Sequence, residues 1–423
     1  MSQLSPEVQK KLENVPYVQF LCSNILGKLH SMEEHVREVP GNFKNGLGVD
    51  GSSIPGYATV TNSDVHLMAD QSTLQTINID GEGPMTKVFC DVHNTDGTRA
   101  SGCVRSILRE QIEKAHKMGF EPFFMSELEW FYLKNGEPLD DGHYLSVAPD
   151  DKAGPLRRQV CRHLDEAGMK VRRAHHECAA GQNEIELNLT PALKNADDTC
   201  TAMWLIRLLA DQQGIEANFM PKPLGSDKAG NGLHQHQRLH DLKTGENLFA
   251  NFDHPKELSP LGKKYVAGLV KYAREITAVF GMDEQTFDRL KPGHEAPVWS
   301  MWAGSNRNAL VRVPAISKPE SARCEFRAGD ASGSPHLLAA VMLAAGLKGI
   351  EDDIAVPPEC NVDPETELTP EQRKEMGIEL LPTSLAECAR ILDASEFLHE
   401  VLGEGLCNYL IHSKEPGFNP YAH

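Results

Sequence analysis

Four segments of the chain carry charged or imidazole side chains at every second position. In an extended strand, alternate side chains face the same side of the sheet. Each segment therefore predicts a strand with one polar face, and the mainly apolar residues between indicate that the other face is buried. The alternating residues are Glu127 and Glu129 in SELEWFY, Glu184 and Glu186 in NEIELNL, His234 and His236 in GLHQHQ, and Arg323, Glu325 and Arg327 in ARCEFRAG.

The residue types on these faces complement one another. Carboxylates and imidazoles are ligands for divalent cations, and guanidinium groups bind phosphate and carboxylate. His175, His176 and Glu177 precede the second segment and add to the ligand types. A charged face on one strand alone is more often simply solvated. If the four strands share a sheet, however, they bring together what phosphoryl transfer requires, which is positioning and charge neutralisation.

The sequence contains no Walker A motif and no dinucleotide-binding fingerprint. A glycine-rich loop is therefore not expected to bind phosphates, and metals and arginines would have to do so. No HExxH motif is present either, which weighs against a zinc hydrolase.

Composition limits the class of protein. The 423 residues include 42 basic and 60 acidic side chains, a formal net charge of −18, which disfavours nucleic acid and anionic membranes as partners. The ten cysteines form no CxxC pair, as is typical of a reducing compartment. We find no signal-peptide pattern and no apolar run long enough to span a membrane, so we expect a cytoplasmic protein.

Periodicity and turn residues predict two domains. Strands expected at 17–22 and 89–92 suggest a small sheet-rich domain over residues 1–100, and an apolar helical period from Val104 opens a larger domain over 101–423. The remaining expected elements are helices over 5–15, 195–211 (begun by Asp197 and Asp198), 259–280 and 334–350, and a surface connection over 351–369.

Taken together, the motifs resemble the glutamine synthetase family, nearly end to end and in the family's order. They are DGSSIPG (50–56), ELE (127–129), HHExxxGQNE (175–184), FMPKP…GNGLHQH (219–236), RLKPGHEAP (289–297), NRNALVRVP (306–314), RCEFR (323–327) and LAAGLKGI (343–350). The resemblance implies an α+β chain with an N-terminal β-grasp domain. It also implies a C-terminal glutamine synthetase/guanido kinase-like catalytic domain with a curved antiparallel sheet. In this family, subunits form hexameric rings, which stack in pairs in bacterial-type enzymes, with active sites between neighbours.

The resemblance also assigns roles to residues. One Mg²⁺ or Mn²⁺ would be held by Glu129, Glu177 and Glu184, and a second by Glu127, His234 and Glu325. The substrate glutamate would contact Arg289, Gly230, His234, Glu129 and Arg327, and ATP would contact His236, Arg307, Arg312 and Arg323. The catalytic residues would be Asp50 of a neighbouring subunit, Glu295, Arg307 and Arg327.

The implied reaction is ATP-dependent ligation of ammonia to the γ-carboxylate of glutamate through γ-glutamyl phosphate. An alternative is a γ-glutamyl-amide ligase for a primary amine such as methylamine, a polyamine or an aromatic amine, with a pocket wall near Pro55, Tyr57 and His294. A further alternative is a non-catalytic regulatory paralogue. It is motivated by three departures from the family pattern, Leu189, Arg238 and Glu320, which map to the nucleoside end of the ATP site.

Overall fold

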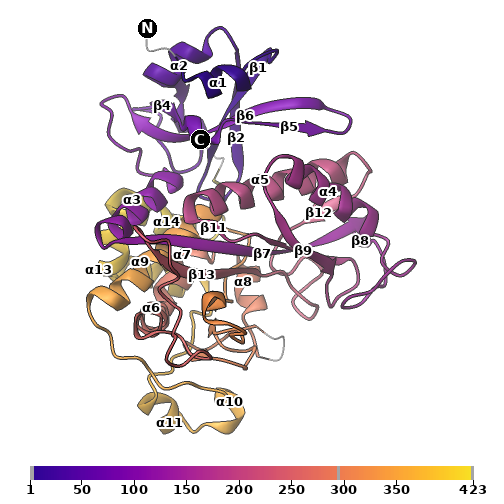
Figure 1. Cartoon of the computed structure of the whole chain (residues 1–423). Helices are drawn as coiled ribbons and strands as arrows, with labels where there is room; N and C mark the ends of the chain where they lie inside the picture. The colour runs from indigo at the N-terminus through magenta and orange to yellow at the C-terminus, as the bar shows by residue number, and fades with distance from the viewer. Residues whose placement is uncertain (1–3, 293–295, 421–423) are drawn as a thin grey trace.

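The computed structural model describes residues 4–292 and 296–420. Its N-terminal part is a six-stranded sheet in the order β2-β1-β6-β4-β3, with β5 paired to β6 (Figure 1). The β1–β6 pair is parallel and the other pairs are antiparallel. The predicted strands at 17–22 and 89–92 are confirmed as parts of β1 and β6. The strands are β1 (Tyr17–Ser23), β2 (Leu29–His35), β3 (Leu47–Asp50), β4 (Asp64–Ala69), β5 (Gln75–Ile79) and β6 (Gly83–Asn94).

A ten-stranded sheet forms the centre of the larger part of the chain. Its main order is β14-β15-β16-β13-β7-β10-β9, and β8, β11 and β12 pair with β7. The long strand β7 pairs antiparallel with β10 on one side and β13 on the other. The four predicted polar-faced segments therefore lie in one sheet. The strands are β7 (Phe120–Lys134), β8 (Glu137–Pro138), β9 (Val171–His176), β10 (Gln182–Leu187), β11 (Thr190–Pro191), β12 (Glu216–Asn218), β13 (Leu233–Asp241), β14 (Trp302–Ala303), β15 (Val311–Arg312) and β16 (Cys324–Phe326).

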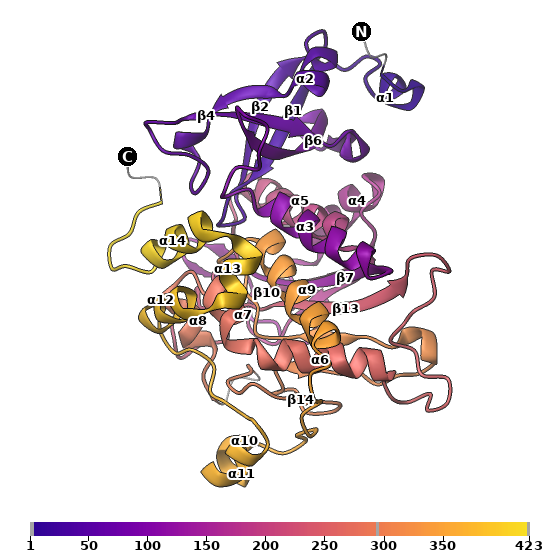
Figure 2. The ribbon, with the colours of Figure 1, turned by 90° about the vertical axis from the view of Figure 1, so that its left-hand side faces the viewer.

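Helices lie between the two sheets and against the larger one. Figures 1 and 2 show α3, α4 and α5 between the sheets, with α6 beside α9 farther down. The helix predicted from Val104 and that predicted over 334–350 are confirmed as α3 and α9. The longer helices are α3 (Val104–Lys117), α4 (Gly154–Glu166), α5 (Ala192–Asp211), α6 (Pro260–Lys271), α7 (Ala273–Phe280), α9 (Pro335–Glu351), α12 (Leu385–Ala394), α13 (Glu396–Leu402) and α14 (Glu404–Ser413), and the short ones are α1 (Pro6–Lys11), α2 (Val39–Asn45), α8 (Glu284–Arg289), α10 (Pro364–Glu367) and α11 (Pro370–Glu375).

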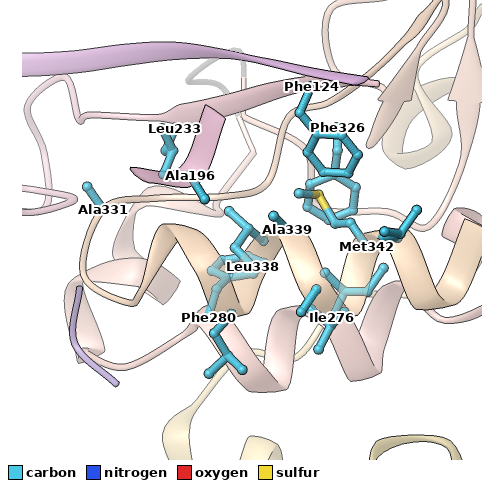
Figure 3. Packing of buried hydrophobic residues seen from close by; sticks show 14 of the residues in the cluster. Phe124, Ala196, Leu233, Ile276, Phe280, Phe326, Ala331, Leu338, Ala339 and Met342 are labelled. Atoms are coloured by element: carbon cyan, nitrogen blue, oxygen red, sulfur yellow. The ribbon is translucent and has the colours of Figure 1, made fainter. Parts of the chain in front are cut away.

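The main core packs one face of the large sheet against α9 and α7. Figure 3 shows Phe124, Leu233 and Phe326 of this sheet close to side chains of the helices. Helix α9 is buried along most of its length, because it contacts α3, α5, α6 and α7 on different sides. With one sheet face committed to this core, the polar residues of the strands are left on the other face. The helix residues in the figure include Ile276, Phe280, Leu338, Ala339 and Met342.

Four element predictions need correction. Helix α1 ends at Lys11 rather than at residue 15. Helix α5 begins at Ala192, directly after Pro191, so Asp197 and Asp198 lie inside it and do not start it. The surface connection contains α10 at Pro364–Glu367.

The long helix expected over 259–280 is two helices. Ser259 caps α6, as predicted, with its hydroxyl accepting from Gly262 N–H. Tyr272 then leaves the helical region, at φ −97° and ψ 20°, and its ring stacks on Phe397 with centroids 4.2 Å apart. The break allows α6 and α7 to pack separately against α9.

A buried arginine links the N-terminal sheet to α5. Arg105 of α3 is 1% exposed and its guanidinium lies 2.9 Å from a carboxylate oxygen of Asp70, 3.0 Å from one of Asp91 and 2.9 Å from one of Asp197. The network explains why an acidic residue lies inside α5. Among residues 4–292 and 296–420, no helix is long and apolar enough to cross a bilayer.

Candidate active site

The register of the large sheet aligns the polar side chains in rows. In the first row, Glu184 of β10 lies between His175 of β9 and Glu129 of β7. The second row runs through Arg173, Glu186, Glu127 and His234, and the third through Met125, His236, Glu325 and Arg312. Residues that are distant in sequence therefore share one face because neighbouring strands pair at this register.

All residues of these rows except Met125 line a pocket of about 840 Å³. Every predicted site residue among the described residues, except Asp50, lines this pocket. They are Glu127, Glu129, Glu177, Glu184, Gly230, His234, His236, Arg289, Arg307, Arg312, Arg323, Glu325 and Arg327.

Two groups of donor atoms in the pocket are compact enough to hold a cation. The candidate ligand atoms of His175, Glu177 and Glu184 lie within 4.8 Å of one another, as do those of a second group, Glu127, His236 and Glu325. Carboxylate oxygens with one imidazole suit Mg²⁺ or Mn²⁺.

These groups differ from the predicted ligand sets in one member each. His234 lies between the groups, with Nδ1 3.3 Å from a Glu127 oxygen and Nε2 3.9 Å from a Glu129 oxygen. One oxygen of Glu129 accepts hydrogen bonds from Gly232 N–H at 2.8 Å and from Gln182 Nε2 at 3.2 Å. Its other oxygen faces His234. His234 and Glu129, the predicted ligands outside the compact groups, therefore lie beside these groups.

Electrostatics in the pocket favour a bound cation. Burial and the Glu129 and Glu127 carboxylates raise the pKa of Glu184 to about 7, despite a hydrogen bond with His175. Burial also raises the pKa of Glu129. Closely spaced carboxylates repel one another, and a divalent ion would relieve that repulsion. The donor set thus fits the metals that the resemblance implies.

Glu325 has a different environment. It is 1% exposed, and its carboxylate accepts from Arg312 Nη1 at 3.0 Å and from Arg327 Nη1. Burial alone would raise its pKa, but His236 and Arg327 lower it to about 2. Glu325 is therefore ionised near neutral pH and links two guanidinium groups to the other members of the second donor group, Glu127 and His236.

The substrate-binding arginine predicted at 289 is buried at the end of α8. Its Nη2 donates to the carbonyls of Ala328 and Gly329. Its Nε has no partner among the described residues, and the side chain lines the pocket. Gly230 lies beside it, and a Cβ there would be 2.2 Å from the Pro221 carbonyl oxygen, so only glycine fits.

Asp50 does not line this pocket. Asp50 lies in the N-terminal part, where it is exposed and accepts from Ser52 N–H at 2.9 Å and from Ser53 Oγ at 3.1 Å. Glu295 and His294 lie outside the described residues. Tyr57, expected at the pocket wall, is instead 4% exposed, and its hydroxyl donates to the Ser23 carbonyl.

Of the departures from the family pattern, Arg238 has a clear contact. Its Nη1 donates to the Glu320 carbonyl at 2.8 Å, while the Glu320 side chain is exposed. Arg238, Glu320 and Leu189 do not line the pocket.

Several pocket residues were not assigned from the sequence. Tyr144 stacks edge-on against His175, with ring centroids 5.4 Å apart, and burial together with Glu177 and Glu184 raises its pKa. It follows β8 in a loop, where no periodicity marks it. Arg172 and Arg173 also line the pocket.

Family models match almost the whole chain. The model described as "Glutamine synthetase, beta-Grasp domain" matches residues 14–95, and "Glutamine synthetase, catalytic domain" matches residues 101–423. The glutamine synthetase of Mycolicibacterium smegmatis is 37% identical over 420 residues, covering 96% of this chain and 93% of that protein. The glutamine synthetase of Methanosarcina mazei is 35% identical over 419 residues, covering 97% and 93%.

Solved structures of glutamine synthetase-like proteins have a similar fold. A GmaS structure described as its ADP complex superposes with a TM-score of 0.82 at 25% identity, covering 98% of this chain and 95% of that chain. A Plasmodium falciparum glutamine synthetase gives a TM-score of 0.86 at 23% identity, covering 98% and 95%, and shows the shared fold.

The fold and the metal- and phosphate-binding residue types define a ligase that uses ATP to activate a carboxylate. The chain belongs to the glutamine synthetase family. The predicted α+β architecture, with a β-grasp domain before a catalytic domain, is confirmed. The family uses glutamate, ATP, ammonia and divalent metals and forms oligomers.

Proposed function

We propose that the protein ligates ammonia to the γ-carboxylate of glutamate and releases ADP and phosphate. One observation carries the proposal most strongly. Metal-type donors and five predicted substrate- or phosphate-binding arginines line a single pocket on one face of the large sheet. That combination suits the transfer of a phosphoryl group to a carboxylate.

Glutamate and ATP are both anions, so arginines are assigned to each. Arg289 binds the α-carboxylate of glutamate, and Arg327 lies at the γ-carboxylate. Arg307, Arg312 and Arg323 neutralise the ATP phosphates, with His236 near the nucleotide. This assignment is supported by Arg289, which is 5% exposed and whose Nε has no partner among the described residues, because a buried guanidinium group needs an anionic partner.

Two divalent ions complete the site in this proposal. Glu129, Glu177 and Glu184 hold one, and Glu127, His234 and Glu325 hold the other. His175 and His236 lie close enough to take part in the two groups. When bound, the ions neutralise phosphate charge during transfer.

The chemistry follows from the weakness of a carboxylate as an electrophile. A γ-carboxylate oxygen attacks the γ-phosphorus and ADP leaves. The nitrogen of ammonia then attacks the acyl carbon and phosphate leaves. Ammonium must first lose a proton, and we assign its binding and deprotonation to Asp50 of a neighbouring subunit, with Glu295 accepting a further proton.

Two assembly features belong to the same proposal. Asp50 does not line the pocket of its own chain, which supports a ring in which one subunit completes the site of the next. The proposed assembly is a hexameric ring, and a stacked dodecamer is the alternative. We place the enzyme in the cytoplasm.

A test compares acceptors. Phosphate release from ATP is measured with glutamate and Mg²⁺ or Mn²⁺, using ammonium, methylamine, a polyamine or an aromatic amine. We expect turnover to require glutamate and ammonium. A higher kcat/KM with one amine than with ammonium would identify a γ-glutamyl-amide ligase. No phosphate release with any acceptor would favour the regulatory paralogue.

A further inference from the structure

Two neighbouring arginines on the pocket wall have no role in the proposed reaction. Arg172 and Arg173 both belong to β9 and both line the pocket. They share one carboxylate, Glu186, which is 5% exposed. Its two oxygens accept from Arg172 Nη1 at 2.8 Å and from Arg173 Nη1 at 3.1 Å. The three side chains together therefore carry one net positive charge.

A strand irregularity explains how consecutive residues reach the same carboxylate. Neighbouring side chains on a regular strand point to opposite faces. In the β9–β10 pair, Glu186 is opposite Arg173 while Leu187 is opposite Val171, so Arg172 is an extra residue at this register shift. Such bulges turn a side chain toward a new direction and are frequent beside active sites.

Contacts distinguish the two arginines. The Arg172 side chain is 36% exposed and the Arg173 side chain is 60% exposed. Arg172 Nη1 also lies 3.8 Å from the sulfur of Met125, which is paired with His236 in the third row of the sheet. Arg172 therefore projects toward the part of the pocket that holds His236.

A second guanidinium group of the pocket lies at the same histidine. Arg323 donates from Nε to His236 Nδ1 at 3.1 Å and from Nη1 to the Ser321 carbonyl at 3.3 Å. Among the described residues, no ion pair includes Arg323. Arg172 and Arg323 both line the pocket, and an anion bound between them would neutralise their like charges.

We propose that Arg172 is a further nucleotide-binding residue, which shares a phosphate of the nucleoside triphosphate with Arg323 and is held by Glu186 through the bulge. The inference rests on the proposed function, because it places the nucleotide in this pocket.

Binding of ADP and adenosine to the full-length protein, measured by calorimetry with Mg²⁺, tests this. We expect Arg172→Gln to raise the Kd of ADP roughly tenfold or more, because a charge-assisted hydrogen bond is lost. Adenosine has no phosphate, so its Kd should stay within about twofold. Arg173→Gln is the matched control, since it removes the same charge from the same carboxylate, and it should change the Kd of ADP less than about threefold.

Several outcomes would overturn the inference. If Arg172→Gln binds ADP as tightly as the unaltered protein does, Arg172 does not contact a phosphate. An equal loss of ADP affinity in Arg173→Gln would show that the net positive charge of the pocket, and not a specific contact, attracts ADP. An equal loss of adenosine affinity in Arg172→Gln would show that Arg172 contacts the nucleoside. No ADP binding by the unaltered protein would instead refute the proposed nucleotide site. Should Arg172→Gln fold poorly, Arg172→Lys keeps the charge without the planar fork and should still weaken ADP binding.

Discussion

Glu325 is the residue at which the proposed metal-binding and substrate-binding parts of the site meet. It lies opposite His236 in the sheet and opposite Arg312 on its other side. Its carboxylate also accepts from Arg327. A single buried charge thus orients two guanidinium groups and belongs to the second group of metal-type donors.

Replacement of Glu325 by glutamine should therefore impair the site severely. We expect Glu325→Gln to lower glutamate-dependent phosphate release by roughly 100-fold or more, because a ligand charge is lost and two arginines lose their anion. Mn²⁺ binding, measured by titration, should weaken in parallel.

Glu371→Gln provides the control, because Glu371 is exposed on α11 and outside the pocket. Its rate and Mn²⁺ affinity should match those of the unaltered protein. Full activity in Glu325→Gln would contradict the assigned metal set.

Strand alternation and the family resemblance together predicted most of the charged residues that line the pocket, because side chains at i and i+2 share a face whichever strands pair. It could not predict Arg172, since a bulge is a property of the pairing between two strands. Tyr144 was also missed, because its loop meets His175 only in the folded chain. Tyr57 was assigned to the wrong environment, because a tyrosine near a functional motif can equally belong to the core.

Helices α5 and α9 are joined by a buried ion pair. His336 Nε2 lies 2.8 Å from a carboxylate oxygen of Asp197, and His336 is fully buried. Burial alone would lower the pKa of His336, but Cys200 and Asp197 raise it to about 9. The imidazolium form is therefore stabilised by folding.

The pair should make stability depend on pH in a defined direction. An unfolded histidine titrates near pH 6.5, below the folded value, so the contribution of His336 is fully present below about pH 6.5. It is lost as pH rises through about 9. The loss is on the order of 3 kcal/mol in the free energy of unfolding.

Urea unfolding at pH 6.0 and pH 9.5 would measure this contribution. The stability difference between the unaltered protein and His336→Gln should be large at pH 6.0 and smaller at pH 9.5. His254→Gln, at an exposed position, should show no such change. An identical difference for His336→Gln at both pH values would refute the linkage.

Element boundaries were harder to predict than element types. The sequence around Tyr272 contains no glycine or proline that would end a helix, so the break between α6 and α7 depends on tertiary packing. Asp197 looked like a helix start, yet it lies within α5 because it pairs with Arg105 and His336. Tertiary contacts override local signals in both places.

At the scale of the whole molecule, the N-terminal sheet is fixed to the catalytic part by a charge network. Arg105 and Arg109 of α3 both contact Asp70 and Asp91, and Arg105 also contacts Asp197. The position of Asp50 relative to the large sheet is thereby set. In the proposed ring, that geometry lets the N-terminal part of one subunit contribute Asp50 to the pocket of the next subunit.

The central claim is that this pocket activates glutamate by phosphorylation and passes the acyl group to ammonia. The most direct measurement is mass spectrometry of the products from ATP, glutamate labelled with ¹⁸O in the γ-carboxylate, and ¹⁵N-ammonium. We predict glutamine with ¹⁵N in its side-chain amide, and one ¹⁸O in each phosphate released. Phosphate without ¹⁸O, or phosphate release without ¹⁵N-glutamine, would contradict the account.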